Sequence, residues 1–346
     1  MNEIKCMLPI FFEKNRVFRV YKGGKLFSDF FSDNSEDGSF PEEWIASSVE
    51  AIKGASKEHE GLSIIKGTDI FFRDFAYDHK EELFGKDGSL DILVKILDSA
   101  IRLPAQTHPD KEFSKKYLNS SFGKTEMWIV LGKRENAKIY FGFKEGTARK
   151  DLENAIKNSD TDKNIMTTIM NEIDVNVGDV YLIPARVIHA IGAGCLILEV
   201  QEPTDFTIEP ERFCDDYRLS DSDMYLGLPK DIAIDCFSMS ASGEDVIRLG
   251  KKNPELISDN ENVKYEKLIN ENDTPCFSVN RLTVKKSCFL EKAPAIYVVT
   301  KGEGRLSGDD FSCEIKKGSY FFMPYSAKGK YEITADTEIE IVECFT

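Results

Sequence analysis

Four side chains in this sequence offer the nitrogen and oxygen atoms that divalent metal ions bind: Gln106, His108, Glu126 and His189. Gln106 and His108 stand two residues apart, so on a strand both side chains point to the same face. Two neutral imidazoles, a carboxylate and an amide oxygen suit zinc and also accept manganese, iron or cobalt. Four such ligands leave room for water or substrate oxygens, which is typical of a catalytic metal site.

A simpler interpretation exists for each ligand taken alone. A histidine beside a proline, as in His108-Pro109, more often begins a helix or makes a local hydrogen bond than binds a metal. The combination of four residues favours the metal site. The other histidines, His59 and His79, lie among charged residues and are expected to be solvated surface side chains.

The elements that position these residues are predicted to be mostly strands. Short runs of β-branched and aromatic residues between Gly, Pro and Asn are typical of a β-sandwich or barrel. The clearest runs are Ile139–Phe143, Val180–Ile183, Cys195–Val200, Ile296–Thr300 and Ile339–Cys344. Apolar residues at helical spacing in Thr147–Ile156 predict a helical segment at about 145–170. The polar stretch 210–266 lacks strand alternation and predicts helices and loops.

An internal repeat predicts two related β units. The run Gly178–Pro184 is matched by Gly318–Pro324, with six residues from Gly to Pro in both. In each run the glycine is expected at a turn with positive φ, and the proline is expected to end a strand. A strand that runs into a glycine precedes each copy, in Glu126–Gly132 and Ile296–Gly302.

The two copies differ where the metal would bind. Counted from the shared glycine, Glu126 has Ile296 as its counterpart, and counted from the shared proline, His189 has Gly329. The second unit is therefore expected to be a structural β unit without a metal.

Length and charge limit the function classes. A chain of 346 residues exceeds the usual size of a single core, so more than one domain is expected. With 60 acidic and 45 basic side chains, the net charge of −15 argues against nucleic acid and anionic membrane surfaces as partners.

No signal peptide or membrane span is recognisable, and the eight cysteines show no CxxC pair, so a cytoplasmic protein with reduced cysteines is expected. No heptad or long apolar stripe indicates assembly, so a monomer is expected.

Several runs together resemble the type I mannose-6-phosphate isomerases (phosphomannose isomerases) of the cupin superfamily. The resemblance covers most of the first β unit and includes an N-terminal Glu-x-Trp-x-x-Ser segment. The matching runs are Pro41–Trp44 with Ser47, Leu93–Asp98, Gln106–Lys111, Gly123–Trp128, Gly178–Pro184, Ile188–Gly192 and Leu198–Gln201.

The resemblance implies a mainly β fold of two cupin (jelly-roll) β-barrels with small helical insertions. The catalytic, metal-binding cupin domain would span 1–205, a connector of helices and loops 206–265, and a second cupin domain without metal ligands 266–346. The implied activity interconverts mannose 6-phosphate and fructose 6-phosphate through an enediol(ate), with one zinc ion per chain. The family's zinc ligands fall on Gln106, His108, Glu126 and His189.

The resemblance also implies roles for further residues. Lys124 matches an active-site lysine that can neutralise developing negative charge, and Glu199 matches an active-site carboxylate that is a candidate proton carrier. Lys95 matches a position linked to phosphate, and Asp205 matches an acidic position in the substrate site. Without the resemblance, Lys124 reads as a surface lysine in a turn and Glu199 as an outward-facing strand carboxylate.

Two positions depart from the family pattern. Pro104 stands where the family has a serine implicated in phosphate binding, and Glu209 stands where it has an arginine. Arg212, three residues further on, is a candidate to replace that arginine as a catalytic cation. The departures leave two alternatives open: a zinc cupin that acts on a different sugar or sugar phosphate, and a non-catalytic sugar-binding protein. The sequence does not decide the substrate, the metal or the oligomeric state.

Overall fold

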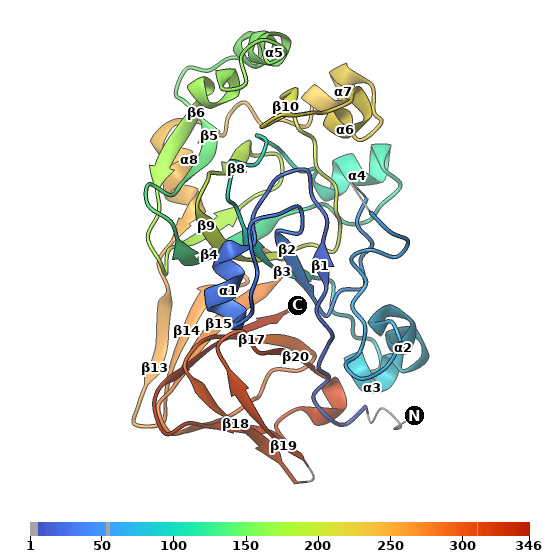
Figure 1. The fold of residues 1–346 in the computed structure, drawn as a ribbon, viewed down its shortest axis with the longest axis vertical. Coiled ribbons are helices and arrows are strands. Elements are labelled where there is room, and N and C mark those ends of the chain that lie inside the picture. Colours follow the sequence, from blue (N-terminus) through green and yellow to red (C-terminus); the bar gives the residue numbers. More distant parts are fainter. Residues whose placement is uncertain (1–5, 53–55, 310) are drawn as a thin grey trace.

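The computed structural model describes residues 6–52, 56–309 and 311–346, and its secondary structure is mainly β. Two β units lie one above the other along the long axis of the molecule (Figure 1). All eight cysteines lie in the described residues, and none of them forms a disulfide. Within the described ranges, every helix is too short or too polar to cross a membrane.

The first unit pairs a large sheet with a small one around a core. Trp128 and Ile197 of the large sheet and Ile139 and Ala190 of the small sheet are fully buried in this core. The large sheet has the strand order β1 (Arg16–Val17), β2 (Glu42–Ile45), β3 (Leu93–Asp98), β9 (Cys195–Gln201), β4 (Glu126–Lys133), β7 (Val180–Ile183) and β12 (Lys251–Lys252). The small sheet has the order β6 (Met170–Asp174), β5 (Lys138–Phe143) and β8 (His189–Ile191).

The second unit repeats this arrangement and encloses its own apolar cluster. Its large sheet has the order β13 (Glu255–Asp259), β14 (Val263–Ile269), β15 (Ser278–Val284), β22 (Ile339–Phe345), β17 (Ala295–Lys301) and β20 (Tyr320–Met323). Its small sheet has the order β16 (Ser287–Phe289), β21 (Glu332–Thr334), β18 (Glu303–Gly308) and β19 (Phe311–Lys316). All five strand runs named from the sequence are strands in the structure.

The predicted repeat is confirmed by backbone conformation and topology. Gly178 and Gly318 have φ of 95° and 88°, which is the turn conformation expected of both. Strands β3-β9-β4-β7 of the first unit correspond to β15-β22-β17-β20 of the second, with antiparallel pairing at each step.

Strand register shows that the counterpart of Glu126 differs from the one predicted by counting residues. Glu126 pairs with Ile183, one residue before the repeated proline, and the equivalent pair in the second unit is Ala295 with Met323. The counterpart is therefore Ala295 rather than Ile296. Counting from the glycine gives the wrong residue, because Gly302 lies one residue further from Ala295 than the glycine in β4 lies from Glu126. Alanine offers no ligand atom, so the second unit still lacks this metal ligand.

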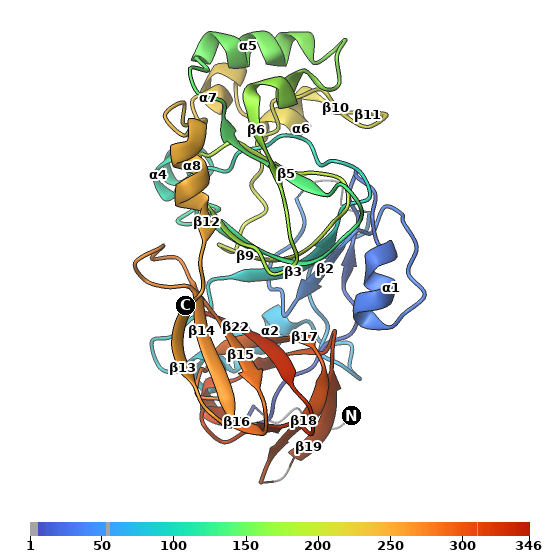
Figure 2. The same cartoon turned by 90° about the vertical axis from the view of Figure 1, so that its left-hand side faces the viewer.

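The two units share a core. The outer faces of the two large sheets pack on each other, and Met127 and Leu198 of the first unit join Ile296 and Val342 of the second in one buried cluster. Alternation along β9 explains how one strand serves two cores, because Leu198 points to this shared cluster while Ile197 points into the first unit. Figure 2 shows the large sheets stacked between the units.

Helices and short segments surround the first unit. α5 (Arg149–Asn158) and the 3-10 helix η1 (Ile165–Ile169) confirm the predicted helical segment at about 145–170. The others are α1 (Lys25–Phe31), α2 (Phe72–Asp78), α3 (Lys80–Phe84), α4 (Lys111–Tyr117), α6 (Asp221–Tyr225), α7 (Lys230–Ile234) and α8 (Gly243–Gly250), the hairpin β10 (Phe213–Cys214) and β11 (Tyr217–Arg218), and the 3-10 helix η2 (Tyr325–Ala327) near the second unit.

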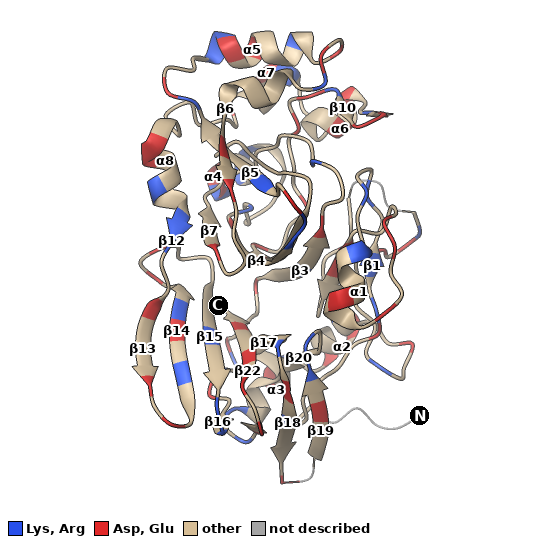
Figure 3. Cartoon of the chain, turned by 60° about the vertical axis from the view of Figure 1, so that its left-hand side comes forward, with Lys and Arg blue, Asp and Glu red and all other residues tan. Residues whose placement is uncertain are grey.

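The prediction of helices and loops up to residue 265 is wrong from residue 251 onward. Strand β12 joins the first large sheet, and β13 and the start of β14 form the edge of the second. β13 is exposed along its whole length, and charged side chains occur along β13 and β14 (Figure 3). An edge strand without a buried face, such as β13, has no apolar alternation, so the sequence pattern could not reveal it.

Candidate metal centre and pocket

Three predicted metal ligands converge in the first unit. Glu126 begins β4, His189 begins β8, and His108 lies in the loop before α4. His108 Nε2 lies 3.2 Å from Glu126 Oε2, and His189 Nε2 lies 3.4 Å from Glu126 Oε1. All three residues are buried, and their ligand atoms lie within 4.8 Å of one another. They form the only such cluster of His, Cys, Asp and Glu among the described residues.

Gln106 is held beside this cluster by backbone pairing. Its N–H donates to the His189 carbonyl at 2.8 Å, and the His189 N–H donates back to the Gln106 carbonyl at 2.9 Å. Its side chain lines the adjoining pocket. The bridge therefore places Gln106 next to His189 of the cluster.

Hydrogen bonds orient both imidazoles for metal binding. His108 Nδ1 lies 2.8 Å from the Phe206 carbonyl, and His189 Nδ1 lies 2.9 Å from the Val187 carbonyl. A carbonyl only accepts, so each Nδ1 carries the proton and each Nε2 keeps its lone pair. Burial, assisted by Lys124, lowers the pKa of His108 to about 3, and burial also lowers the pKa of His189. Neutral imidazole is the form that binds a metal.

Unsatisfied atoms support a metal at this point. Glu126 Oε1 and His189 Nε2 are buried and make no hydrogen bond with any described residue. Buried polar atoms without partners are costly, and a divalent cation among them would satisfy both. The Lys124 ammonium lies 2.9 Å from both His108 Nε2 and Glu126 Oε2. The donor set therefore fits a metal ion of the kind that nitrogen and oxygen ligands bind.

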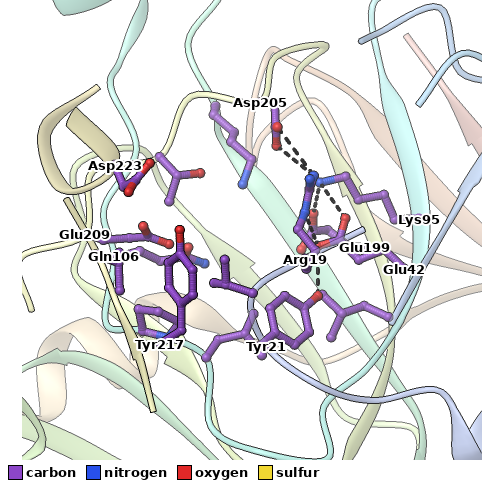
Figure 4. Close-up of a pocket in the computed structure, with 17 residues that line it drawn as sticks. Arg19, Tyr21, Glu42, Lys95, Gln106, Glu199, Asp205, Glu209, Tyr217 and Asp223 are labelled. Atoms are coloured by element: carbon purple, nitrogen blue, oxygen red, sulfur yellow. Dashed lines mark hydrogen bonds and ion pairs between the residues drawn. The ribbon is translucent and has the colours of Figure 1, made fainter. Parts of the chain in front are cut away.

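A pocket opens beside the cluster and collects other predicted residues. Its empty space, counted out to the solvent at its mouth, is about 780 Å³. Lys95, Lys124, Glu199 and Asp205 all line it. Figure 4 labels Lys95, Glu199 and Asp205 among the residues of this pocket. Lys95 and Glu199 face each other on adjacent strands, and Lys95 Nζ lies 3.4 Å from Glu199 Oε1.

Charge and burial shift the pKa values of Glu199 and Lys95. Burial raises the pKa of Glu199, and the nearby Glu126 carboxylate raises it further. Burial alone would lower the pKa of Lys95, but Glu42 and Glu199 together raise it. Glu199 Oε1 is buried and makes no hydrogen bond within the described part of the chain, and its ion-pair partner is Lys95 Nζ, 3.4 Å away.

The pocket also contains residues to which sequence reasoning gave no role. Arg19 donates from Nε to Glu42 Oε1 at 3.0 Å and from Nη2 to Asp205 Oδ1 at 3.2 Å. Tyr21 donates its hydroxyl to the same Glu42 oxygen at 2.8 Å. Burial alone would raise the pKa of Glu42, but Arg19 and Lys95 lower it to about 2. Glu42 belongs to a recognised run, whereas no local pattern distinguishes Arg19.

Arg212 does not reach this pocket. Its Nη2 lies 2.7 Å from Asp221, and its Nη1 donates to the Leu219 carbonyl at 2.9 Å. Pro104 and Glu209, the two departures from the family pattern, do line the pocket. The cation predicted at Arg212 is therefore committed elsewhere, while Arg19 brings a guanidinium to the pocket.

Comparisons with known proteins give relatives of one kind. No family model matches the chain. The mannose-6-phosphate isomerase of Streptococcus mutans is 28% identical over 340 residues, 96% of each chain. Mannose-6-phosphate isomerase ManA of Bacillus subtilis is 28% identical over 276 residues, 76% of this chain and 78% of that one.

Solved structures agree. The mannose 6-phosphate isomerase structure from Bacillus subtilis superposes with a TM-score of 0.76 at 22% identity and covers 97% of this chain and 99% of its own. A mannose 6-phosphate isomerase bound with zinc and yttrium superposes with a TM-score of 0.67 at 13% identity and covers 96% of this chain and 98% of its own. In sequence over most of its length, and in fold, this chain is similar to the mannose-6-phosphate isomerases.

Proposed function

We propose that this protein is an aldose–ketose isomerase that interconverts mannose 6-phosphate and fructose 6-phosphate and holds one zinc ion through Gln106, His108, Glu126 and His189. One observation carries the proposal. The buried His–Glu–His cluster, with both Nε2 lone pairs turned inward, adjoins a pocket that contains Lys95 and Glu199. The relatives with this fold are mannose-6-phosphate isomerases.

The residues of the pocket supply a path for the proton. In the proposed step the Glu199 carboxylate takes the proton from C2 of the open-chain aldose. The electron pair of that C–H bond forms the C1–C2 double bond, and the carbonyl electrons move to O1. O1 gains a proton as O2 loses one, and Glu199 then returns its proton to C1 to give the ketose.

Cations limit the cost of the negative charge that develops on the substrate oxygens. Lys124, at the boundary between the ligand cluster and the pocket, is the nearest ammonium group to the proposed metal ligands. A bound zinc ion would supply Lewis-acid polarisation of the same oxygens. Lys95 holds Glu199 in place by their ion pair, and Arg19 holds Glu42 and Asp205.

The remaining parts of the proposal are predictions from the sequence. They are the description of both β units as cupin barrels, the cytoplasmic location and the monomeric state. The paired sheets of each unit are consistent with cupin folds.

A specific observation favours a second candidate, an unphosphorylated sugar as substrate. The pocket is lined by more acidic than basic side chains: Glu42, Glu199, Asp205, Glu209 and Asp223 against Arg19, Lys95 and Lys124. A phosphate dianion would meet more repulsion than attraction there, whereas a neutral sugar can donate hydroxyl hydrogen bonds to carboxylates. Glu209 contributes to this imbalance at the position where the family resemblance implies an arginine.

The decisive experiment is an isomerase assay of the zinc-loaded protein with mannose 6-phosphate and mannose in parallel. We expect turnover that disappears with a chelator, returns with added zinc and is absent in His108→Ala. His79→Ala is the matched control and should retain activity, because His79 lies outside the pocket and packs against Phe75.

The outcomes separate the candidates. Turnover of mannose 6-phosphate alone supports the first candidate, and turnover of mannose alone supports the second. Metal binding without turnover of any aldose or aldose phosphate would contradict both and would indicate a non-catalytic sugar-binding protein. Metal-independent turnover would rule out the proposed metal centre.

A further inference from the structure

The second unit contains a pocket at the place that corresponds to the pocket of the first. Strand register gives the equivalent positions. Lys95 pairs with Glu199, and Asn280 pairs with Glu343. Continuing across both sheets, Glu199 pairs with Trp128, and Glu343 pairs with Tyr297. Glu343 is therefore the counterpart of Glu199, and Asn280 is the counterpart of Lys95.

The residues that line the walls of the two pockets also occupy equivalent positions. Leu97 pairs with Glu42 in the first unit, and Leu282 pairs with Tyr265 in the second. Leu97, Glu42 and Glu199 line the first pocket, and their counterparts Leu282, Tyr265 and Glu343 line the second. The second pocket has a cavity volume of about 340 Å³, at the lower end of the range of ligand sites.

At the base of the second pocket, neutral hydrogen-bonding groups surround the carboxylate, whereas a lysine pairs with its counterpart in the first pocket. Glu343 is buried, and no ion pair joins it to a cation in residues 6–52, 56–309 and 311–346. Instead, Glu343 Oε2 accepts from Asn280 Nδ2 at 2.8 Å and from the Tyr265 hydroxyl at 3.2 Å. The Tyr297 hydroxyl lies 3.1 Å from Glu343 Oε1. A buried carboxylate is costly, and keeping one at the base of an open pocket suggests a use beyond packing.

The lining indicates which ligand fits. Ala295 replaces the glutamate ligand, so the pocket has no comparable metal site. Two carboxylates, Glu291 and Glu343, outnumber the single cation Lys292, which disfavours an anion. Glu343 and the Tyr265 hydroxyl can accept hydrogen bonds from hydroxyl groups. At the rim, Phe289 is 53% exposed and offers an aromatic face.

We infer that the second pocket, with Glu343 and Tyr265 at its base and Phe289 at its rim, is a non-catalytic binding site for a neutral polyhydroxy compound such as an unphosphorylated monosaccharide. This site is distinct from the proposed active site and does not depend on the proposed function. Its ligand is recognised by hydroxyl hydrogen bonds and apolar packing rather than by a metal or a phosphate.

Methyl NMR spectroscopy of the full chain tests this inference with D-mannose as the probe. The equivalent residues Leu97 and Leu282 report the two pockets separately. We expect the Leu282 and Val263 methyl resonances to shift saturably with D-mannose, and the affinity for mannose 6-phosphate at these reporters to be about tenfold lower. The inference is overturned if Leu282 and Val263 do not respond to D-mannose.

Variants separate binding from a purely structural network. Tyr265→Phe keeps the ring and removes the hydroxyl, and we expect it to weaken the Leu282 response about tenfold. Phe289→Ala, at an exposed position, should weaken it as well and serves if Tyr265→Phe does not fold. Tyr325→Phe is the matched control outside the pocket and should bind like the wild type. Unchanged binding in a folded Tyr265→Phe variant and in Phe289→Ala would contradict the site.

Discussion

At the scale of single residues, the site depends on carboxylates in different surroundings. Glu42 is surrounded by Arg19, Lys95 and Tyr21 and stays ionised. Glu199 has one cation at 3.4 Å and an oxygen without a hydrogen bond to any described residue. The first carboxylate organises the cations, and the second is the proton carrier of the reaction proposed above.

Replacement of Glu199 tests its proposed role as the proton carrier. Glu199→Gln keeps the shape but cannot take a proton, so kcat should fall by about 100-fold or more while KM changes little. Glu199→Asp keeps the acid and should recover part of the activity. Steady-state kinetics on the substrate that the wild type turns over provide the measurement. An unchanged kcat in Glu199→Gln would assign the proton transfer to another group.

Glu42 gives a prediction about acid stability. Its pKa in the folded protein is about 2, below the ordinary value of 4.5. The ionised carboxylate therefore stabilises the fold fully above about pH 4.5, and this stabilisation, about 3 kcal/mol, is lost as the pH falls towards 2. Glu42→Gln should be less stable than wild type at pH 7 by about that amount, and the difference should shrink between pH 4.5 and 2.

The measurement is urea unfolding of chelator-treated protein at several pH values. Glu58→Gln is the control, because the Glu58 side chain is 88% exposed and its replacement should change little. A stability difference between wild type and Glu42→Gln that does not depend on pH would contradict the ionic role of Glu42.

At the scale of elements, the repeated turn before β7 and β20 fixes the register of both large sheets. The two glycines share a conformation, but their surroundings differ. A Cβ added at Gly178 would meet no atom within 4 Å, whereas one added at Gly318 would lie 2.5 Å from the Phe30 carbonyl oxygen. The second turn is packed against the end of α1, and the first is open.

This difference provides a matched pair of variants. Gly178→Ala should cost only the strain of positive φ, roughly 1–2 kcal/mol. Gly318→Ala should cost about 1–3 kcal/mol more, because the Phe30 backbone must move. Unfolding in urea gives both values. Equal losses of unfolding free energy in the two variants would show that the Phe30 backbone moves away from the added Cβ without strain.

At the scale of the whole molecule, the two units are joined by a continuous apolar core. The outer faces of the large sheets contribute side chains to one buried cluster. The only two tryptophans, Trp44 and Trp128, are fully buried in the first unit. Their fluorescence therefore reports whether a substitution in the second unit changes the unfolding of the first.

Ile296→Ala in the shared core should destabilise both units together. Truncating a buried isoleucine costs roughly 2–5 kcal/mol, and the tryptophan transition should shift with the transition seen by circular dichroism. Ile257→Ala, at a position 45% exposed, is the control. A tryptophan transition that stays in place while circular dichroism shifts would indicate independently unfolding units.

The sequence by itself determined the features that local patterns encode. The runs with alternating apolar residues became strands, the repeated Gly-to-Pro module became the same turn and strand twice, and His108, Glu126 and His189 met as expected. These predictions succeeded because strand periodicity and turn conformation depend on neighbouring residues.

Only the tertiary structure decided the rest. Arg19 meets Asp205 across 186 residues of sequence, and no local pattern distinguishes such a cation from a surface arginine. Arg212, nearer in sequence to the departure at Glu209, is held by Asp221 instead. The edge strand β13 lacks the alternation that burial imposes, and the pocket around Glu343 emerges only from register across the sheets. Long-range pairing, which one sequence does not encode locally, is the physical reason in each case.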